Sequence, residues 1–209
     1  MPPVPQRRNP ARTRARILAA ALDEFAARGF DAARVDRIAA RARVNKALLY
    51  YYFGNKQALY HAVLLGQADQ LFAALQPVVE GPLEAEPKLS AYVEALVRYF
   101  SDRNPLTRLM LRELADGGRH LEADVLRRLV MMPGLLGAIV QQGRRERVFA
   151  DRDPLMVHLV LVGTALFMSA NAAIRTRIAQ MRLAQPPVDT ADVIAELQAL
   201  ARRLLVKES

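Results

Sequence analysis

Residues 35–56 read VDRIAARARVNKALLYYYFGNK, and this stretch decides the fold of the chain. Its first part spaces apolar residues at i, i+3, i+4 and i+7, the pattern of one buried helix face: Val35, Ile38, Ala39 and Ala42. Asn45 is a good N-cap for a second helix that carries Leu49 inward, and Asn55 can cap a third helix. The stretch therefore predicts a helix, a turn, a short helix and the start of another helix.

The short second helix directs an unusual set of side chains away from the core. Because successive helix residues rotate by roughly 100°, Lys46, Ala47, Tyr50 and Tyr51 face away from Leu49. A cation, a small residue and two phenols on one exposed face suit the major groove of DNA better than plain solvent. We predict a helix-turn-helix whose recognition helix covers residues 45–51.

Four short motifs surround this helix-turn-helix: Gly29-Phe30, Ile38-Ala39, Leu49-Tyr50-Tyr51-Tyr52-Phe53 and Asn55-Lys56-Gln57-Ala58-Leu59. With them, residues 13–64 resemble the DNA-binding domain of the TetR/AcrR family of bacterial transcription regulators. Two positions depart from the family pattern. Arg34 stands where a Thr or Ser usually caps the second helix, so any phosphate contact there would come from its charge. Arg43 replaces the usual turn glycine, which costs about 1 kcal/mol if the backbone needs a positive φ.

The resemblance implies a set of DNA contacts. Residues 46–48 and Tyr51 would approach bases, while Tyr50, Tyr52 and Lys56 would hold phosphates. The complete set of predicted DNA-binding residues is Arg34, Asn45, Lys46, Ala47, Leu48, Tyr50, Tyr51, Tyr52 and Lys56. Because a two-fold symmetric protein imposes its symmetry on the DNA, the expected partner is a double-stranded operator with an inverted repeat.

The distribution of charge agrees with a DNA-binding N-terminal region. The 209-residue chain has a net charge of +9, and residues 1–66 hold 12 Lys/Arg against 4 Asp/Glu. Nearly all the excess positive charge therefore lies around the helix-turn-helix, as expected for a phosphate-binding module. The alternative is a basic surface that binds only solvent. Residues 1–12, rich in Pro and Arg, are either a basic arm that reaches DNA or a disordered tail.

The sequence offers few residues for disulfides, metal sites or catalysis. The chain has no cysteine, which excludes disulfides and thiolate zinc sites, and no secretory signal, so we expect a cytoplasmic location. It contains no nucleotide-binding glycine loop, nucleophile elbow or His-Glu-x-x-His motif, so we expect neither an enzyme nor a cofactor. His120, Glu122 and Asp124 could bind a metal but are better explained as the acidic start of a helix.

The rest of the chain reads as helical, with no strand pattern. We predict a first helix over residues 13–28, a helix from 56 that ends before Pro77, and a connector at 76–87. Pro133 predicts an interruption at residues 131–134. The fold expected is all-α, with a DNA-binding domain at 13–64 and a larger helical effector-binding and dimerisation domain at 65–209.

Two C-terminal segments favour assembly of two copies. Residues 155–174 are apolar on nearly all sides, which indicates a helix buried between its own domain and a second subunit, or a membrane span. His158 and Asn171 interrupt the run, so we do not expect a membrane partner. We expect a last helix over 189–206 to pair with this one, and the two helices to form a four-helix bundle with the same helices of a second copy, as in the resembled family. The alternative is ordinary packing within one chain.

The resemblance also implies an apolar small-molecule effector inside the C-terminal domain. Methionine-rich and aromatic positions are candidates for its pocket: Phe100, Met110, Met131, Met132, His158, Phe167 and Met168. Each could instead be an ordinary core residue, and His158 a hydrogen-bonded one. The function expected is a transcriptional repressor released by its effector. The alternatives are a nonspecific architectural DNA-binding protein and a membrane-associated helical protein.

Overall fold

The computed structural model describes residues 9–100, 105–186 and 189–206. These residues form ten helices and no β-sheet, with one isolated antiparallel bridge between Phe149 and Val206. The all-α prediction is therefore confirmed. The helices are α1 (Pro10–Ala32), α2 (Val35–Arg41), α3 (Lys46–Phe53), α4 (Lys56–Glu80), α5 (Ala85–Tyr99), α6 (Pro105–Ala115), α7 (Ala123–Arg145), α8 (Pro154–Ala170), α9 (Ala172–Gln180) and α10 (Thr190–Leu205).

Helix α1 begins earlier than the sequence predicted. The side chain of Asn9 accepts a hydrogen bond from the N–H of Arg12 at 3.3 Å, and Pro10 follows at the start of the helix. Proline is favoured there because the first helical N–H has no partner in any case. The predicted start at Thr13 is wrong, and the part of the predicted arm before Asn9 lies outside the described residues. Gly29 interrupts the helix with a φ of 76°.

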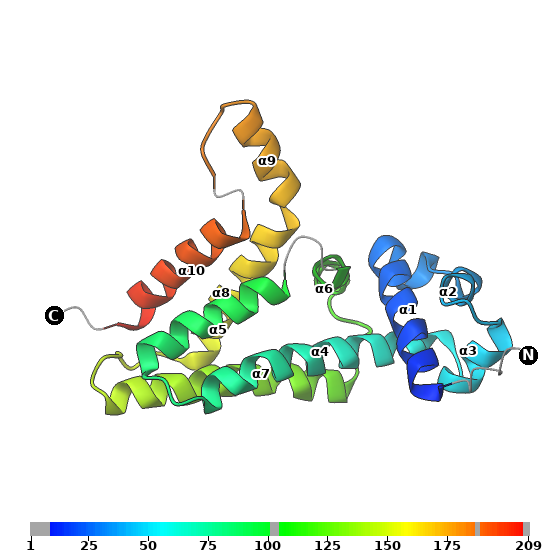
Figure 1. Cartoon of the computed structure of the whole chain (residues 1–209), viewed down its shortest axis with the longest axis horizontal. Coiled ribbons are helices and arrows are strands. Elements are labelled where there is room, and N and C mark those ends of the chain that lie inside the picture. The colour runs from blue at the N-terminus through cyan, green and yellow to red at the C-terminus, as the bar shows by residue number, and fades with distance from the viewer. Residues whose placement is uncertain (1–8, 101–104, 187–188, 207–209) are drawn as a thin grey trace, which may run out of the picture.

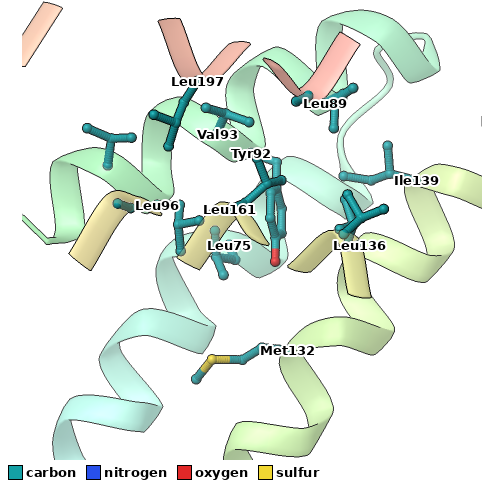
Figure 2. Close-up of a cluster of buried hydrophobic side chains, with 14 of the residues drawn as sticks. Leu75, Leu89, Tyr92, Val93, Leu96, Met132, Leu136, Ile139, Leu161 and Leu197 are labelled. Carbon is teal, nitrogen blue, oxygen red and sulfur yellow. The ribbon is translucent and has the colours of Figure 1, made fainter. Parts of the chain in front are cut away.

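The buried apolar side chains form two separate cores. The first unites α1, α2 and α3 with the start of α4, and it also takes in Leu109 of α6 and Val125 of α7. Figure 1 shows α1 to α3 grouped at one end of the molecule, with α4 leading away from them toward the other helices. The larger core lies among α4, α5, α7, α8 and α10. Figure 2 shows part of it, with Tyr92 surrounded by apolar side chains such as Leu75 and Leu136.

Two prolines lie inside helices that the sequence predicted to break. Helix α4 continues through Pro77 to Glu80, and the carbonyl of Pro77 accepts the N–H of Gly81 at 3.0 Å. Helix α7 likewise runs through Pro133 as one helix, with Met132 and Pro133 buried. The predicted end before Pro77 and the predicted interruption at 131–134 are both wrong. A proline removes only one helical hydrogen bond, and the helix after it still packs on the larger core, through the partly buried Val78 and Val79 in α4 and the buried Leu136 in α7. The connector between α4 and α5 is correspondingly short.

The apolar stretch at 155–174 is two helices. Asp153 caps α8 and Pro154 begins it, as predicted, but the helix ends at Ala170 and α9 departs at an angle of 58°. By length and composition, this bent pair and α4 could each cross a membrane. Within one chain this stretch is not buried on all sides, because Phe167 is 64% exposed. Burial of its remaining face by a second subunit stays a prediction.

Candidate nucleic-acid interface and ligand cavity

The helix-turn-helix forms as the sequence predicted. In α3, the side chain of Asn45 accepts the N–H of Leu48 at 2.7 Å, and Asn55 does the same for Ala58 of α4 at 2.8 Å. Arg34 precedes α2 without a capping side-chain hydrogen bond, as expected. The turn between α2 and α3 holds Arg43 at a φ of 53°, the left-handed conformation that glycine supplies most easily. The chain thus keeps the turn geometry despite the substitution.

Helix α3 presents an exposed outer face. Leu49 and Phe53 are buried on its inner side, whereas Tyr51 is 82% exposed. Beside this face lies an open hollow of about 920 Å³ that α3 shares with the start of α1 and the turn. Its lining includes Asn9, Arg12, Thr13, Arg16, Arg43, Val44, Asn45, Ala47, Leu48 and Tyr51. Three guanidinium groups and four of the predicted contact residues therefore surround one concave surface.

Arg12 and Arg43 were not among the predicted DNA-binding residues. The sequence showed Arg12 as part of an arm and Arg43 only as a misplaced turn residue. The excess of positive charge in the first 66 residues was the signal that could have found them. Helix α1 brings Arg12 beside α3 because α1 starts three residues earlier than expected.

Two predicted lysine contacts have partners within the chain. The ammonium of Lys46 lies 3.0 Å from Oδ1 of Asp36 in α2, and this hydrogen bond raises the pKa of Lys46. The Lys56 ammonium donates to the carbonyl oxygen of Asp31 at 3.0 Å and lies 4.8 Å from the centre of the Phe30 ring. Both ammonium groups lie at the edge of the DNA-binding head, the part formed by α1, α2, α3 and the start of α4, where they can also attract phosphates.

The remaining predicted contacts differ in exposure. Tyr50 is exposed, while Tyr52 is partly buried and packs against the head core. The Tyr51 and Tyr52 rings meet edge to face with centres 5.6 Å apart. Arg34 is exposed beside the start of α2. The structure thus gathers eight of the nine residues on or next to α3, and Arg34 lies at the first residue before α2.

A second site lies inside the larger domain. A cavity of about 370 Å³ lies between α4, α6, α7 and α8, opens to the surface, and is lined almost wholly by apolar side chains. Of the seven predicted effector residues, four line it: Phe100, Met110, Met132 and His158. Met131 and Phe167 are exposed on the surface. Met168 lines a separate small hollow of about 30 Å³ beside Phe100.

The residues weighed as metal ligands are distributed over two clusters. His120 does not join Glu122 and Asp124; its Nδ1 lies 2.9 Å from Oε1 of Glu113. Nε2 of His61 instead lies 2.7 Å from Oδ1 of Asp124, and Glu122 lies near both. The hydrogen bond to His61 lowers the pKa of Asp124. Both acidic residues lie at the start of α7, where the helix dipole favours negative charge.

The fold and these two sites define a helix-turn-helix DNA-binding protein with a ligand-sized apolar cavity in a separate helical core. Residues 17–63 match the profile of the bacterial regulatory proteins of the tetR family. Residues 86–193 match the profile of the tetracyclin repressor-like C-terminal domain. The chain belongs to the TetR family of bacterial regulatory proteins.

Individual relatives agree with this assignment. The HTH-type transcriptional repressor SCO4008 of Streptomyces coelicolor is 38% identical over 111 residues, which span 53% of this chain and 54% of that repressor. The HTH-type transcriptional repressor NicS of Pseudomonas putida is 30% identical over 166 residues, 77% of each chain. The crystal structure of the regulator SCO4942 from Streptomyces coelicolor has a TM-score of 0.69 and 28% identity, covering 92% of this chain and 98% of that one. These relatives are named as regulators of transcription.

Proposed function

We propose that this protein is a cytoplasmic, dimeric transcriptional repressor. It binds an inverted-repeat operator through residues 13–64 and leaves it when an apolar molecule occupies the cavity between α4, α6, α7 and α8. The observation that carries the proposal is that α4 and α6 contribute both to the cavity lining and to the core of the DNA-binding head. Leu64 of α4 lines the cavity and also belongs to the head core. A ligand that changes the position of α4 or α6 therefore acts on the DNA-binding head.

Helix α6 supplies the second link between cavity and head. Its Met110 lines the cavity, while its Arg112 reaches the end of α1. The guanidinium of Arg112 donates to the carbonyl oxygens of Ala26 and Ala27 at 3.4 and 3.2 Å. These carbonyls lie in the turn just before Gly29 interrupts the helix. Movement of α6 toward a ligand would pull on the helix that carries Arg12 and Arg16.

The exposed face of α8 supports the proposed dimer. Met156, Val160 and Phe167 recur at i, i+4 and i+11 of α8, and each is between 40% and 64% exposed. A row with this spacing forms one apolar stripe on a helix. Such stripes are the contacts from which two-fold helical bundles are made. We propose that α8 and α10 pack against the same helices of a second copy.

The operator proposal is tested by selecting from random-sequence duplexes at about 0.15 M salt, where exposed charges are partly screened. A recovered inverted repeat is the expected result. Lys46→Ala should change the selected sequence more than the affinity, whereas Tyr50→Ala should weaken binding to every sequence. Recovery of duplexes without a common motif would instead identify a nonspecific DNA-binding protein.

The dimer is tested separately by sedimentation equilibrium. The wild-type protein should sediment as a dimer, and Phe167→Glu should shift it toward monomer because a charge would be buried in the apolar contact. Leu83→Glu is the matched control, since Leu83 is also about half exposed but lies between α4 and α5. Equal effects of the two substitutions would argue against the α8 interface.

A further inference from the structure

The cavity between α4, α6, α7 and α8 has very few polar groups. Among the described residues that line it, Gln67 and His158 are the polar ones, and none carries an acidic or basic side chain. A charged ligand group buried there would have no opposite charge beside it. Such burial is strongly unfavourable, whereas an uncharged polar atom needs only one hydrogen-bond partner. The chemistry of the ligand is therefore set by what Gln67 and His158 can offer.

The ring of His158 is held in one orientation by a buried tyrosine. His158 is 5% exposed, and its Nδ1 lies 2.9 Å from the hydroxyl oxygen of Tyr92, which is fully buried. Figure 2 shows the Tyr92 ring among leucine and isoleucine side chains. Burial raises the pKa of Tyr92, so the phenol keeps its proton. Nδ1 of His158 is the described partner of this hydroxyl, and the phenol therefore donates to it.

This hydrogen bond fixes the proton on the other nitrogen. A neutral imidazole that accepts at Nδ1 carries its proton at Nε2. Burial lowers the pKa of His158 to about 4, so the ring is neutral at pH 7. Nε2 has no described hydrogen-bond partner, and Glu113 Oε2 is the one described side-chain oxygen or nitrogen that is sealed from solvent without a partner. Nε2 of His158 thus retains access to open space, and the open space that this buried side chain lines is the cavity.

The entrance to the cavity is apolar as well. Leu126, Val130, Leu155 and Leu159 line the cavity and are each between 46% and 73% exposed, so they stand where it meets the surface. A molecule passing them meets methyl groups and no charge. Entry therefore favours the same uncharged molecules as the interior.

We propose that the effector is an uncharged, mainly apolar molecule with a ketone, ester or lactone carbonyl, and that the carbonyl oxygen accepts a hydrogen bond from Nε2–H of His158. The inference rests on the proposed function in that the cavity is taken as the effector site. It excludes carboxylates and other anions as effectors, because the polar side chains among the described lining residues, His158 and Gln67, offer only neutral donors and no cation.

The proposal is tested with three probes of matched shape: 2-acetonaphthone, 2-naphthoate and 2-ethylnaphthalene. We expect isothermal titration calorimetry at pH 7 to show the ketone binding at least tenfold more tightly than the carboxylate. In His158→Phe, which keeps an aromatic ring but removes the donor, the preference for the ketone over the hydrocarbon should fall about tenfold, the effect of one lost hydrogen bond. Met110→Leu is the control, since it alters only the apolar lining and should change both affinities together.

A measurement on the unaltered protein covers the case in which His158→Phe does not fold. The chain has three histidines, so the ring nitrogens of His158 can be assigned by ¹⁵N NMR. The expected spectrum has a protonated Nε2 and an unprotonated Nδ1 at pH 7, with the Nε2 proton shifted when 2-acetonaphthone is added. A protonated Nδ1, equal affinity for ketone and carboxylate, or no ketone binding up to 1 mM would each overturn the proposal.

The outcome is separable from that of the proposed function. Ketone binding without selection of an operator would retain the ligand assignment and remove the repressor. Selection of an operator together with tight carboxylate binding would retain the repressor and remove the ligand assignment. Release of a selected operator by 2-acetonaphthone, abolished in His158→Phe, would support both.

Discussion

The carboxylate of Glu113 in α6 accepts a hydrogen bond from the hydroxyl of Tyr60 in α4, at the junction between the DNA-binding head and the larger helical core. Glu113 is 1% exposed, and the same oxygen lies 2.9 Å from Nδ1 of His120. Its second oxygen has no described partner. Burial and the neighbouring carboxylate raise the pKa of Tyr60, so the phenol remains a donor. A buried acid thus joins the two helices that connect cavity and head.

Tyr60→Phe should destabilise the protein by about 1.5–3 kcal/mol, the usual range for a hydrogen bond to a charged group. The substitution removes one donor from a carboxylate that already lacks a partner on its other oxygen, while the ring and its packing stay. Urea unfolding followed by circular dichroism measures the effect. Tyr51→Phe is the matched control, because Tyr51 is 82% exposed and should change stability by less than about 0.5 kcal/mol. Equal effects of the two would show that the Tyr60 hydroxyl contributes nothing at the junction.

The sequence predicts local structure well here because the deciding interactions are local. Asn45 and Asn55 cap helices through backbone groups three residues away, and their role follows from residue type and spacing. The contact between Tyr60 and Glu113 spans 53 residues, and nothing in the local pattern pairs these two side chains. His120 was grouped with its sequence neighbours for the same reason, although the fold pairs it with Glu113.

Burial separates the predicted effector residues that line the cavity from those that do not. Met132 and His158 line the cavity, whereas Met131 and Phe167 lie on exposed helix faces. Residue type cannot separate Met131 from Met132. The inward side of α7 is set by packing against α4, and that of α8 by packing against α5, α7 and α10. An almost uniformly apolar helix such as α8 gives no periodic pattern from which to read its inward side.

Gly143→Ala should destabilise the protein by about 1–3 kcal/mol, the usual cost of overpacking a core. A Cβ added to Gly143 in α7 would lie 2.1 Å from Cδ2 of Phe149, whose ring is fully buried. The ring cannot move freely, because Phe149 is held in the bridge with Val206. Thermal unfolding monitored by circular dichroism measures the loss.

Gly134→Ala in the same helix is the control for Gly143→Ala. An added Cβ at Gly134 meets no atom within 4 Å. Replacing a glycine inside a helix by alanine then stabilises by about 0.5–1 kcal/mol. Opposite signs for the two substitutions are the expected outcome, and a stabilised Gly143→Ala variant would contradict the close approach of Phe149.

The stability of the protein should fall as pH drops from 6.5 toward 4, in part because of His158. Burial lowers the pKa of His158 from 6.5 to about 4 in the folded state. Between these values the unfolded chain binds a proton that the folded chain does not, so lowering the pH favours unfolding. The shift corresponds to roughly 3 kcal/mol once the pH is below both values. Urea unfolding at a series of pH values measures it.

His158→Gln isolates this contribution from that of other titrating groups. Glutamine does not titrate and can still accept a hydrogen bond from Tyr92. Its stability should therefore change less between pH 6.5 and 4 than that of the wild type, while above pH 7 the two should depend on pH alike. Parallel curves over the whole range would mean that His158 takes up its proton equally in both states.

Asp36→Asn should raise the affinity of the protein for random-sequence duplex DNA severalfold at low salt. Asp36 holds the ammonium of Lys46 at 3.0 Å on the edge of α3, so its removal frees a cation and deletes a negative charge beside the predicted major-groove face. Because the gain is electrostatic, it should shrink as salt rises, and the salt slope should steepen by about one phosphate contact. Asp151→Asn makes the same change in net charge far from α3, where Asp151 pairs with Arg144 at 2.8 Å. Fluorescence anisotropy at several salt concentrations compares the two variants. Weaker binding by Asp36→Asn would show instead that Asp36 positions Lys46 for its contact with DNA.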